Sequence, residues 1–111
     1  MLSKERRIKR KDFGDVLKGV RYNSPHFLVY VNRSESKKPT IFSFSVSKKV
    51  ASKAVLRNKM RRQGYGVISS FLNDIKPGFT CFFSYKKEKY PIPYSELEKE
   101  IIGILKNIKL I

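Results

Sequence analysis

The chain has 111 residues, and its 25 Lys and Arg against 9 Asp and Glu give a net charge of +16. Hydrophobic residues make up 41% and aromatic residues 13%, which is enough to form a core and excludes a disordered basic tail. The single cysteine, Cys81, excludes an internal disulfide, and the sequence contains no run of 18 apolar residues. Because charges occur throughout the first 13 residues, we expect no secretory signal. We therefore expect one cytoplasmic domain over residues 1–111 that binds no membrane, and the charge indicates a polyanionic partner.

The N-terminal half is expected to contain one helix and two strands. Residues 13–20 carry apolar side chains at i, i+3, i+4 and i+7, the spacing of an amphipathic helix. Residues 26–31 are rich in β-branched and aromatic side chains, and residues 40–47 alternate polar and apolar ones, so each predicts a strand. We expect the two strands to form a hairpin across the polar turn at 32–39. The apolar side chains expected to share one face of the second strand are Phe42, Phe44 and Val46.

The C-terminal half is expected to add a helix, a strand and a helix. Residues 53–73 have helical spacing, but Gly64 and Gly66 each cost about 1 kcal/mol relative to Ala, so we expect the helix to kink or loosen there. Residues 79–85 predict a strand, and Ser95 resembles the N-cap of a last helix. The expected buried faces of the two helices comprise Leu56, Met60, Val67 and Phe71, and Leu97, Ile101, Ile104, Leu105 and Ile108. This element order indicates an α+β sandwich with the helices on one sheet.

Residues that could carry catalysis unaided are scarce. His26 is the only histidine and opens a strand, where a structural role is favoured. Cys81 lies mid-strand among phenylalanines, which indicates a buried, inert thiol. No Cys/His set has metal-ligand spacing, and the acids form no tight motif of the kind that holds two metals. We therefore expect no catalytic and no metal-binding residue in this chain.

The segment 48–62 is the best candidate for function, because it contains seven basic residues and no acid. On a helix, Lys53, Arg57 and Arg61 would project from one face about 6 Å apart along the axis, near the phosphate spacing of a nucleic-acid strand. Asn58 can offer a donor and an acceptor to a base edge or a 2′-hydroxyl. A solvated basic surface is the alternative, and the lack of acids counts against it. The side chains expected to contact RNA are Lys53, Arg57, Asn58, Lys59, Arg61 and Arg62.

Two adjacent motifs resemble the signature of a known family. Phe44-Ser-Val-Ser-Lys-Lys-Val50 is followed by Ala54-Val-Leu-Arg-Asn-Lys-Met-Arg-Arg62. A Val-Ser-Lys-Lys strand end before an Arg-Asn helix is typical of the bacterial ribonuclease P protein component, although Lys59 replaces the second arginine of its hallmark. The resemblance covers almost the whole chain. It implies an αβββαβα sandwich, with one strand more than the pattern predicts and a left-handed βαβ crossover, which is rare in proteins.

The resemblance also implies partners and roles. Members of this family form a ribonucleoprotein with a catalytic RNA that removes the 5′ leader of precursor tRNA, using Mg²⁺ held mainly by the RNA. The chain would then be the protein subunit of an endonuclease, without an obligate protein partner. Contacts with the catalytic RNA are implied for Arg57, Asn58, Lys59, Arg61 and Arg62, together with Lys48 and Lys49. The implied leader cleft comprises Phe13, Leu17 and Tyr30, with Phe44 as a further candidate.

Three other functions are weighed against this one. A generic RNA-binding or ribosome-associated protein would bind with steep salt dependence but without preference for a leader. A nuclease acting without RNA would need the acid and histidine sets that the sequence lacks. A DNA-compacting protein usually carries long flexible basic tails, which are absent here.

Overall fold

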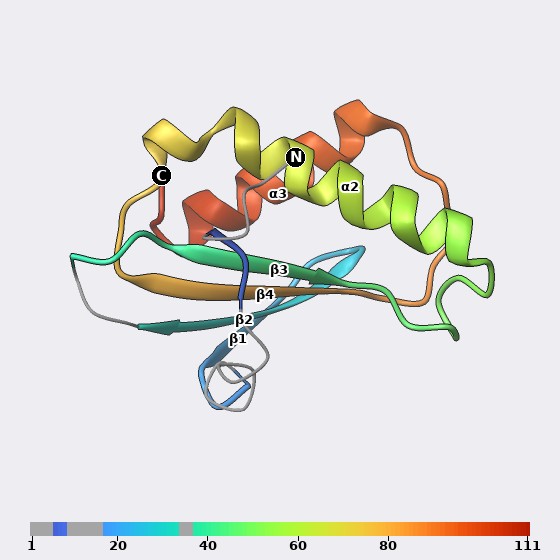
Figure 1. The fold of residues 1–111 in the computed structure, drawn as a ribbon, viewed down its shortest axis with the longest axis horizontal. Coiled ribbons are helices and arrows are strands. Elements are labelled where there is room, and N and C mark those ends of the chain that lie inside the picture. The colour runs from blue at the N-terminus through green and yellow to red at the C-terminus, as the bar shows by residue number, and fades with distance from the viewer. Residues whose placement is uncertain (1–5, 9–16, 34–36) are drawn as a thin grey trace.

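The computed structural model describes residues 6–8, 17–33 and 37–111 (Figure 1). It contains a four-stranded sheet with two helices on one face, which confirms the predicted α+β sandwich. The elements are β1 (Val20–Asn23), β2 (Phe27–Arg33), β3 (Ile41–Ser45), α2 (Ala54–Ser70), the 3₁₀ helix η3 (Leu72–Asp74), β4 (Phe79–Tyr85) and α3 (Tyr94–Asn107).

The first strand, β1, is the additional strand that the resemblance implied. The helix expected over 13–20 lies mostly outside the described residues, but its last position was wrong, because Val20 begins β1. This strand pairs antiparallel with β2, with Val20 opposite Val31. A four-residue edge strand contains too few alternating positions to stand out in the sequence.

The expected hairpin of residues 26–31 with 40–47 is wrong. The strand order is β1-β2-β4-β3, so β4 lies between β2 and β3 and pairs antiparallel with β2 and parallel with β3. In β4 Thr80, Cys81, Phe83 and Tyr85 are all buried, as suits a strand with neighbours on both sides. Hydrophobic periodicity predicts strands but does not say which strands pair.

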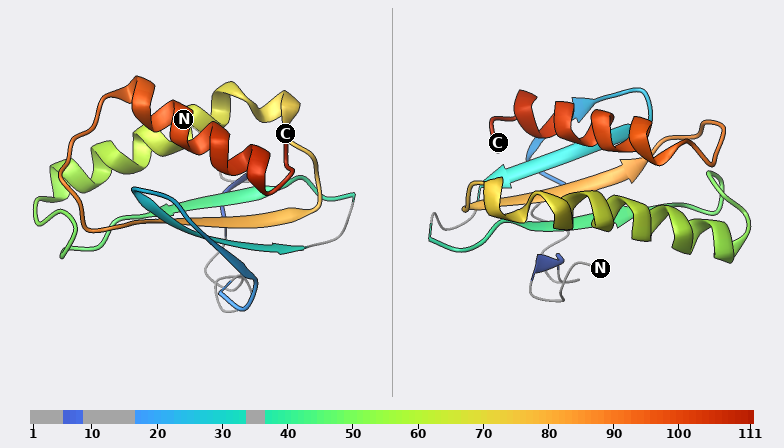
Figure 2. Two further views of the ribbon diagram at one scale, coloured as in Figure 1. Left: turned by 180° about the vertical axis from the view of Figure 1, so that it is seen from behind. Right: turned by 90° about the horizontal axis from the view of Figure 1, so that it is seen from above.

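The connection from β3 through α2 to β4 is a left-handed crossover. In the right-hand view of Figure 2, taken from the helix side, β3 and β4 both run from left to right and β4 lies above β3. When the strands are turned to point upward, β4 therefore lies to the left of β3. This handedness is the one that the resemblance implies, and it is the exception to the general rule.

Both helices bury the faces that their spacing predicts. Met60 and Val67 of α2 are at most 2% exposed, while Leu56 and Phe71 pack at the edge of the core. All five residues predicted for α3 are buried. The predicted N-cap is wrong by two positions, since α3 begins at Tyr94 with Pro93 as its N-cap. No helix in the described part of the chain is long and apolar enough to cross a bilayer.

The two glycines do not interrupt α2, and Gly64 allows close packing against the sheet. The helix runs without a break from Ala54 to Ser70. A Cβ atom on Gly64 would lie 2.5 Å from Cδ2 of Phe44, so the helix backbone rests directly on this ring. Phe44 is 2% exposed and stacks on Phe83 with ring centroids 4.7 Å apart. Phe44 is therefore a core residue between helix and sheet, and its assignment to a leader cleft is corrected.

Candidate nucleic-acid interface

The turn between β3 and α2 places two lysines beside the start of the helix. The carbonyl of Ser47 accepts hydrogen bonds from the backbone N–H groups of Val50 and Ala51, both at 3.1 Å. Ala51 is 4% exposed and anchors the turn in the core. Lys48 and Lys49, inside the turn, are both exposed. The tight turn thus holds them at the surface close to the first turn of α2.

The first turn of α2 concentrates positive charge. Lys53 is its N-cap residue, no side chain caps the helix, and no acid lies in the first turn. Nη1 of Arg57 donates to the carbonyls of Ala51 and Ser52, at 2.9 and 2.8 Å. The guanidinium is therefore held over the turn, with the N–H groups on Nε and Nη2 left for a ligand. The unsatisfied N–H groups and positive dipole end of a helix add to this charge and favour a phosphate.

The following turn of α2 extends the same surface. Nη2 of Arg61 donates to Oδ1 of Asn58, which leaves the amide N–H groups of Asn58 facing solvent. Lys59 and Arg62 are exposed. Among the described residues, no carboxylate lies within ion-pair distance of any cation of the segment 48–62. The structure thus brings the predicted RNA-binding residues together, although Arg57 folds back to the preceding turn instead of extending beside Lys53.

The sheet face opposite the helices, called here the outer face, carries a second group of side chains. The strand register aligns Arg21, Tyr30, Phe82 and Ser43 in one row across the four strands. The rings of Tyr30 and Phe82 stack with centroids 5.9 Å apart and planes at 25°. Such a flat aromatic pair with an arginine at its side can receive an unstacked base.

The predicted cleft residues do not all lie on the outer face. Tyr30 lies on the outer face, Leu17 is 48% exposed, and Phe13 lies outside the described residues. Phe82 was missed by sequence reasoning, because almost every side chain of β4 is apolar. The strict alternation of a strand would have found it, since Phe82 must point away from the buried Phe83.

His26 makes a structural contact. Its Nδ1 lies 2.7 Å from Oε1 of Glu100, while Oε2 of Glu100 accepts hydrogen bonds from the backbone N–H of His26 and from Ser24 Oγ. These bonds tie the turn between β1 and β2 to α3. Cys81 is fully buried, and burial raises the pKa of its thiol. In the described part of the chain, no group of three or more His, Cys, Asp or Glu could hold a metal ion.

Comparisons with known proteins agree on one family. The family model described as Ribonuclease P matches residues 1–109. A protein of Rippkaea orientalis named ribonuclease P protein component is 31% identical, over 85% of this chain and 77% of that protein. The protein of the same name from Microcystis aeruginosa is 31% identical, over 92% and 88%.

Solved structures show the same fold. The RNase P protein of Staphylococcus aureus superimposes with a TM-score of 0.85 at 25% identity, covering 96% of this chain and 98% of that one. The RNase P protein of Thermotoga maritima gives a TM-score of 0.81 at 20% identity, covering 91% and 96%.

Proposed function

The chain belongs to the ribonuclease P protein family, and from this premise we propose that residues 48–62 bind the catalytic RNA and that the outer face binds the 5′ leader of precursor tRNA. Membership makes the chain a subunit of the ribonuclease P ribonucleoprotein, which works with the RNase P RNA in tRNA 5′ maturation. The finer assignment of surfaces to RNAs is our proposal.

The observation that carries the proposal is the unpaired charge of the segment 48–62. Seven cations lie on one turn and two helical turns, and no carboxylate among the described residues neutralises them. Mutual repulsion and the positive helix end both disfavour such a cluster in the free protein. A phosphate backbone supplies the missing negative charge and releases its counterions on binding.

The outer face supports the second half of the proposal. Single-stranded RNA presents unstacked bases, which proteins commonly bind on aromatic rings flanked by cations. Tyr30 and Phe82 form a stacked pair, and Arg21 follows in the same row. The leader of precursor tRNA is the single-stranded part of the substrate, so it suits this face better than a folded RNA helix does.

We assign phosphodiester hydrolysis to the RNA subunit, with Mg²⁺ held mainly by that RNA. Within the described part of the chain, no cluster of three or more His, Cys, Asp or Glu forms a metal site, which is compatible with this proposal. The basic segment would contribute by neutralising phosphates near the metal site, which lowers the repulsion between folded RNA strands. We also place the protein in the cytoplasm, an assignment that the reduced, buried Cys81 supports.

Assembly with RNA tests the first surface. Arg62→Ala removes an exposed charge that makes no hydrogen bond or ion pair with the described residues, and should weaken binding and shallow the log–log salt slope by about one unit. Arg57→Ala should weaken assembly further, because it also frees the turn at Ala51 and Ser52. Lys106→Ala, an exposed charge on the last turn of α3, is the matched control. Equal slopes for all three variants would contradict the proposed surface.

Substrate preference tests the second surface. In the assembled ribonucleoprotein, Tyr30→Ala should raise the KM for leader-bearing precursor by roughly 5- to 150-fold, the range for losing one stacked base. Binding of mature tRNA and assembly with the catalytic RNA should be unchanged. A native complex that binds precursor and mature tRNA equally would contradict a leader face and favour a generic RNA-binding role.

A further inference from the structure

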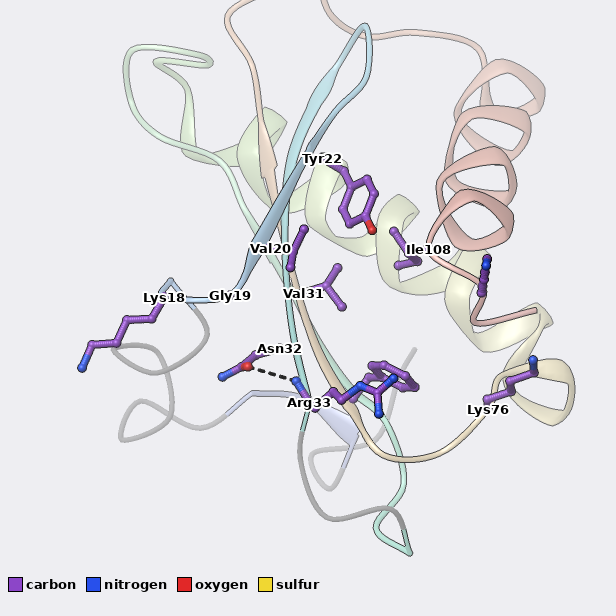
Figure 3. A pocket seen from close by; sticks show the side chains of 11 residues that line it. Lys18, Gly19, Val20, Tyr22, Val31, Asn32, Arg33, Lys76 and Ile108 are labelled. Carbon is purple, nitrogen blue, oxygen red and sulfur yellow. Dashed lines mark hydrogen bonds between the residues drawn. The ribbon is translucent and has the colours of Figure 1, made fainter.

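A pocket of roughly 750 Å³ opens on the helix side of the sheet, at the edge formed by β1 (Figure 3). Val20 and Tyr22 of β1 and Val31 of β2 form one wall, and Ile108 at the end of α3 forms the other. The volume falls within the range of about 300–1,000 Å³ that is common for ligand sites. This pocket is separate from the segment 48–62 and from the outer face.

Positive charge surrounds this apolar floor. The described residues that line the pocket include four cations and no acid, the cations being Lys18, Arg33, Lys76 and Lys109. Lys18 extends outward from the rim, whereas the Arg33 guanidinium lies 5.8 Å from the centre of the Phe79 ring (Figure 3). No carboxylate of the described chain pairs with these four cations. An apolar floor with aromatic rings and a cationic rim matches the base and phosphate of a nucleotide.

The backbone at Lys109 supplies a second, independent observation. Lys109 has φ of 62°, in the left-handed region that glycine or asparagine usually occupies after a helix. The turn is closed by the hydrogen bond from Leu110 N–H to the Leu105 carbonyl, at 2.9 Å. A lysine in this conformation costs about 1 kcal/mol relative to glycine. Strained residues of this kind cluster at functional sites, and this one places a cation at the pocket.

The position of β1 links the pocket to the outer face. β1 is the edge strand of the sheet, so its successive side chains alternate between the two faces. Arg21 and Asn23 belong to the outer face, and Val20 and Tyr22 to the pocket. An RNA strand crossing the outer face toward β1 therefore reaches the pocket by turning around one edge strand. The start of α2, in contrast, lies at the opposite end of the sheet from the C-terminus (Figure 1). Lys76 lies beside the C-terminal residues, because its backbone N–H donates to the Leu110 carbonyl.

We propose that this pocket holds a nucleotide of the 5′ leader, upstream of the nucleotides that lie on the outer face. The proposal rests on the leader assignment made above, and it extends the leader site around the sheet edge. The base lies against Tyr22 and the apolar floor, and its phosphates face Arg33, Lys76 and Lys109.

The test uses the assembled ribonucleoprotein and precursor tRNAs whose leaders are lengthened one nucleotide at a time. Native affinity should rise in two steps, first as the outer face fills and again as the pocket fills. Lys109→Gly should abolish most of the second step, lowering affinity for long leaders by roughly threefold to tenfold. Because glycine suits the backbone at this position, thermal stability should not fall. Arg33→Gln should give the same loss, and Lys106→Gln is the control for charge at the end of α3.

Each other result has a defined meaning. Long-leader affinity unchanged in Lys109→Gly and Arg33→Gln would overturn the pocket assignment. Weakened assembly with the catalytic RNA in these variants would also overturn it, and would assign the pocket to that RNA. If native affinity does not depend on leader length at all and Tyr30→Ala has no effect, the proposed leader face itself fails.

Discussion

Replacing Gly64 by alanine should destabilise the protein, although the same change in an ordinary helix stabilises it. An alanine Cβ would lie 2.5 and 2.6 Å from two ring carbons of Phe44, closer than such atoms approach. The ring has little room to retreat, because it stacks on Phe83 at 4.7 Å and meets Tyr65 at 5.2 Å. The helix must therefore move away from the sheet, or the aromatic cluster must rearrange.

The two opposing effects can be compared in size. Removing glycine from a helix interior gains about 1 kcal/mol, and overpacking a core usually costs about 1–3 kcal/mol. The contact here involves the backbone of α2 and the Phe44 ring, which is packed between Phe83 and Tyr65. We therefore expect an overpacking cost in the upper part of this range. The free energy of unfolding should fall by about 1–2 kcal/mol, and the melting temperature by roughly 5–10 °C.

Thermal and urea unfolding, followed by circular dichroism, measure this change. Gly66→Ala is the matched control, because its nearest neighbour would be Tyr94 Oη at an ordinary 3.5 Å. It should stabilise the protein by up to about 1 kcal/mol. Combining Gly64→Ala with Phe44→Leu should cost less than the sum of the two single changes. If Gly64→Ala is as stabilising as Gly66→Ala, the close-packing explanation is refuted.

Two further predictions concern ionisable groups of the core. Burial raises the pKa of the Cys81 thiol, which keeps it in the unreactive protonated form. Near pH 8.5 a thiol reagent should therefore label Cys81 at least about 100-fold more slowly in the native protein than in the protein unfolded in urea. Equal labelling rates would contradict the burial of Cys81. Burial, with the negative charges of Glu100 and Glu88, raises the pKa of Tyr90 to about 12. Because an unfolded tyrosine ionises near 10, the stability this adds is present below about pH 10 and is lost as pH rises toward 12. Absorbance titration of the native protein against Tyr90→Phe should therefore show one phenol missing near pH 12, and a difference near pH 10 would contradict the prediction.

Sequence reasoning succeeded where a local pattern determines the structure. The apolar face of α3 and the bounds of β4 follow from periodicity alone, because burial of one helix face or of a short apolar strand leaves a direct trace in the sequence. The exposed, unneutralised charge of the segment 48–62 also follows from the sequence, because a run of basic residues without acids is evident before the fold is known.

Sequence reasoning failed where contacts between residues far apart in the sequence determine the structure. The pairing of β2 with β4 joins residues 46 to 58 positions apart, and no residue near Phe27 in the sequence indicates that Tyr85 is its neighbour. Phe44 was assigned to a cleft because its ring looks the same in the sequence whether it faces a ligand or a helix. Gly64, which contacts Phe44, was expected to weaken α2, because the low helix propensity of glycine is evident from the local sequence. Its contribution to stability comes from close contact with β3, which the local sequence does not show.

The central position of β4 in the sheet determines when the protein can fold during its synthesis. β4 joins β2 to β3, yet it is the last strand that the ribosome produces. When the segment 48–62 has emerged from the ribosome, the nascent chain still lacks β4, the strand that joins β2 to β3 in the sheet. Folding must therefore wait until Phe79–Tyr85 has emerged, and the cationic surface becomes ordered in one late, cooperative event rather than piece by piece.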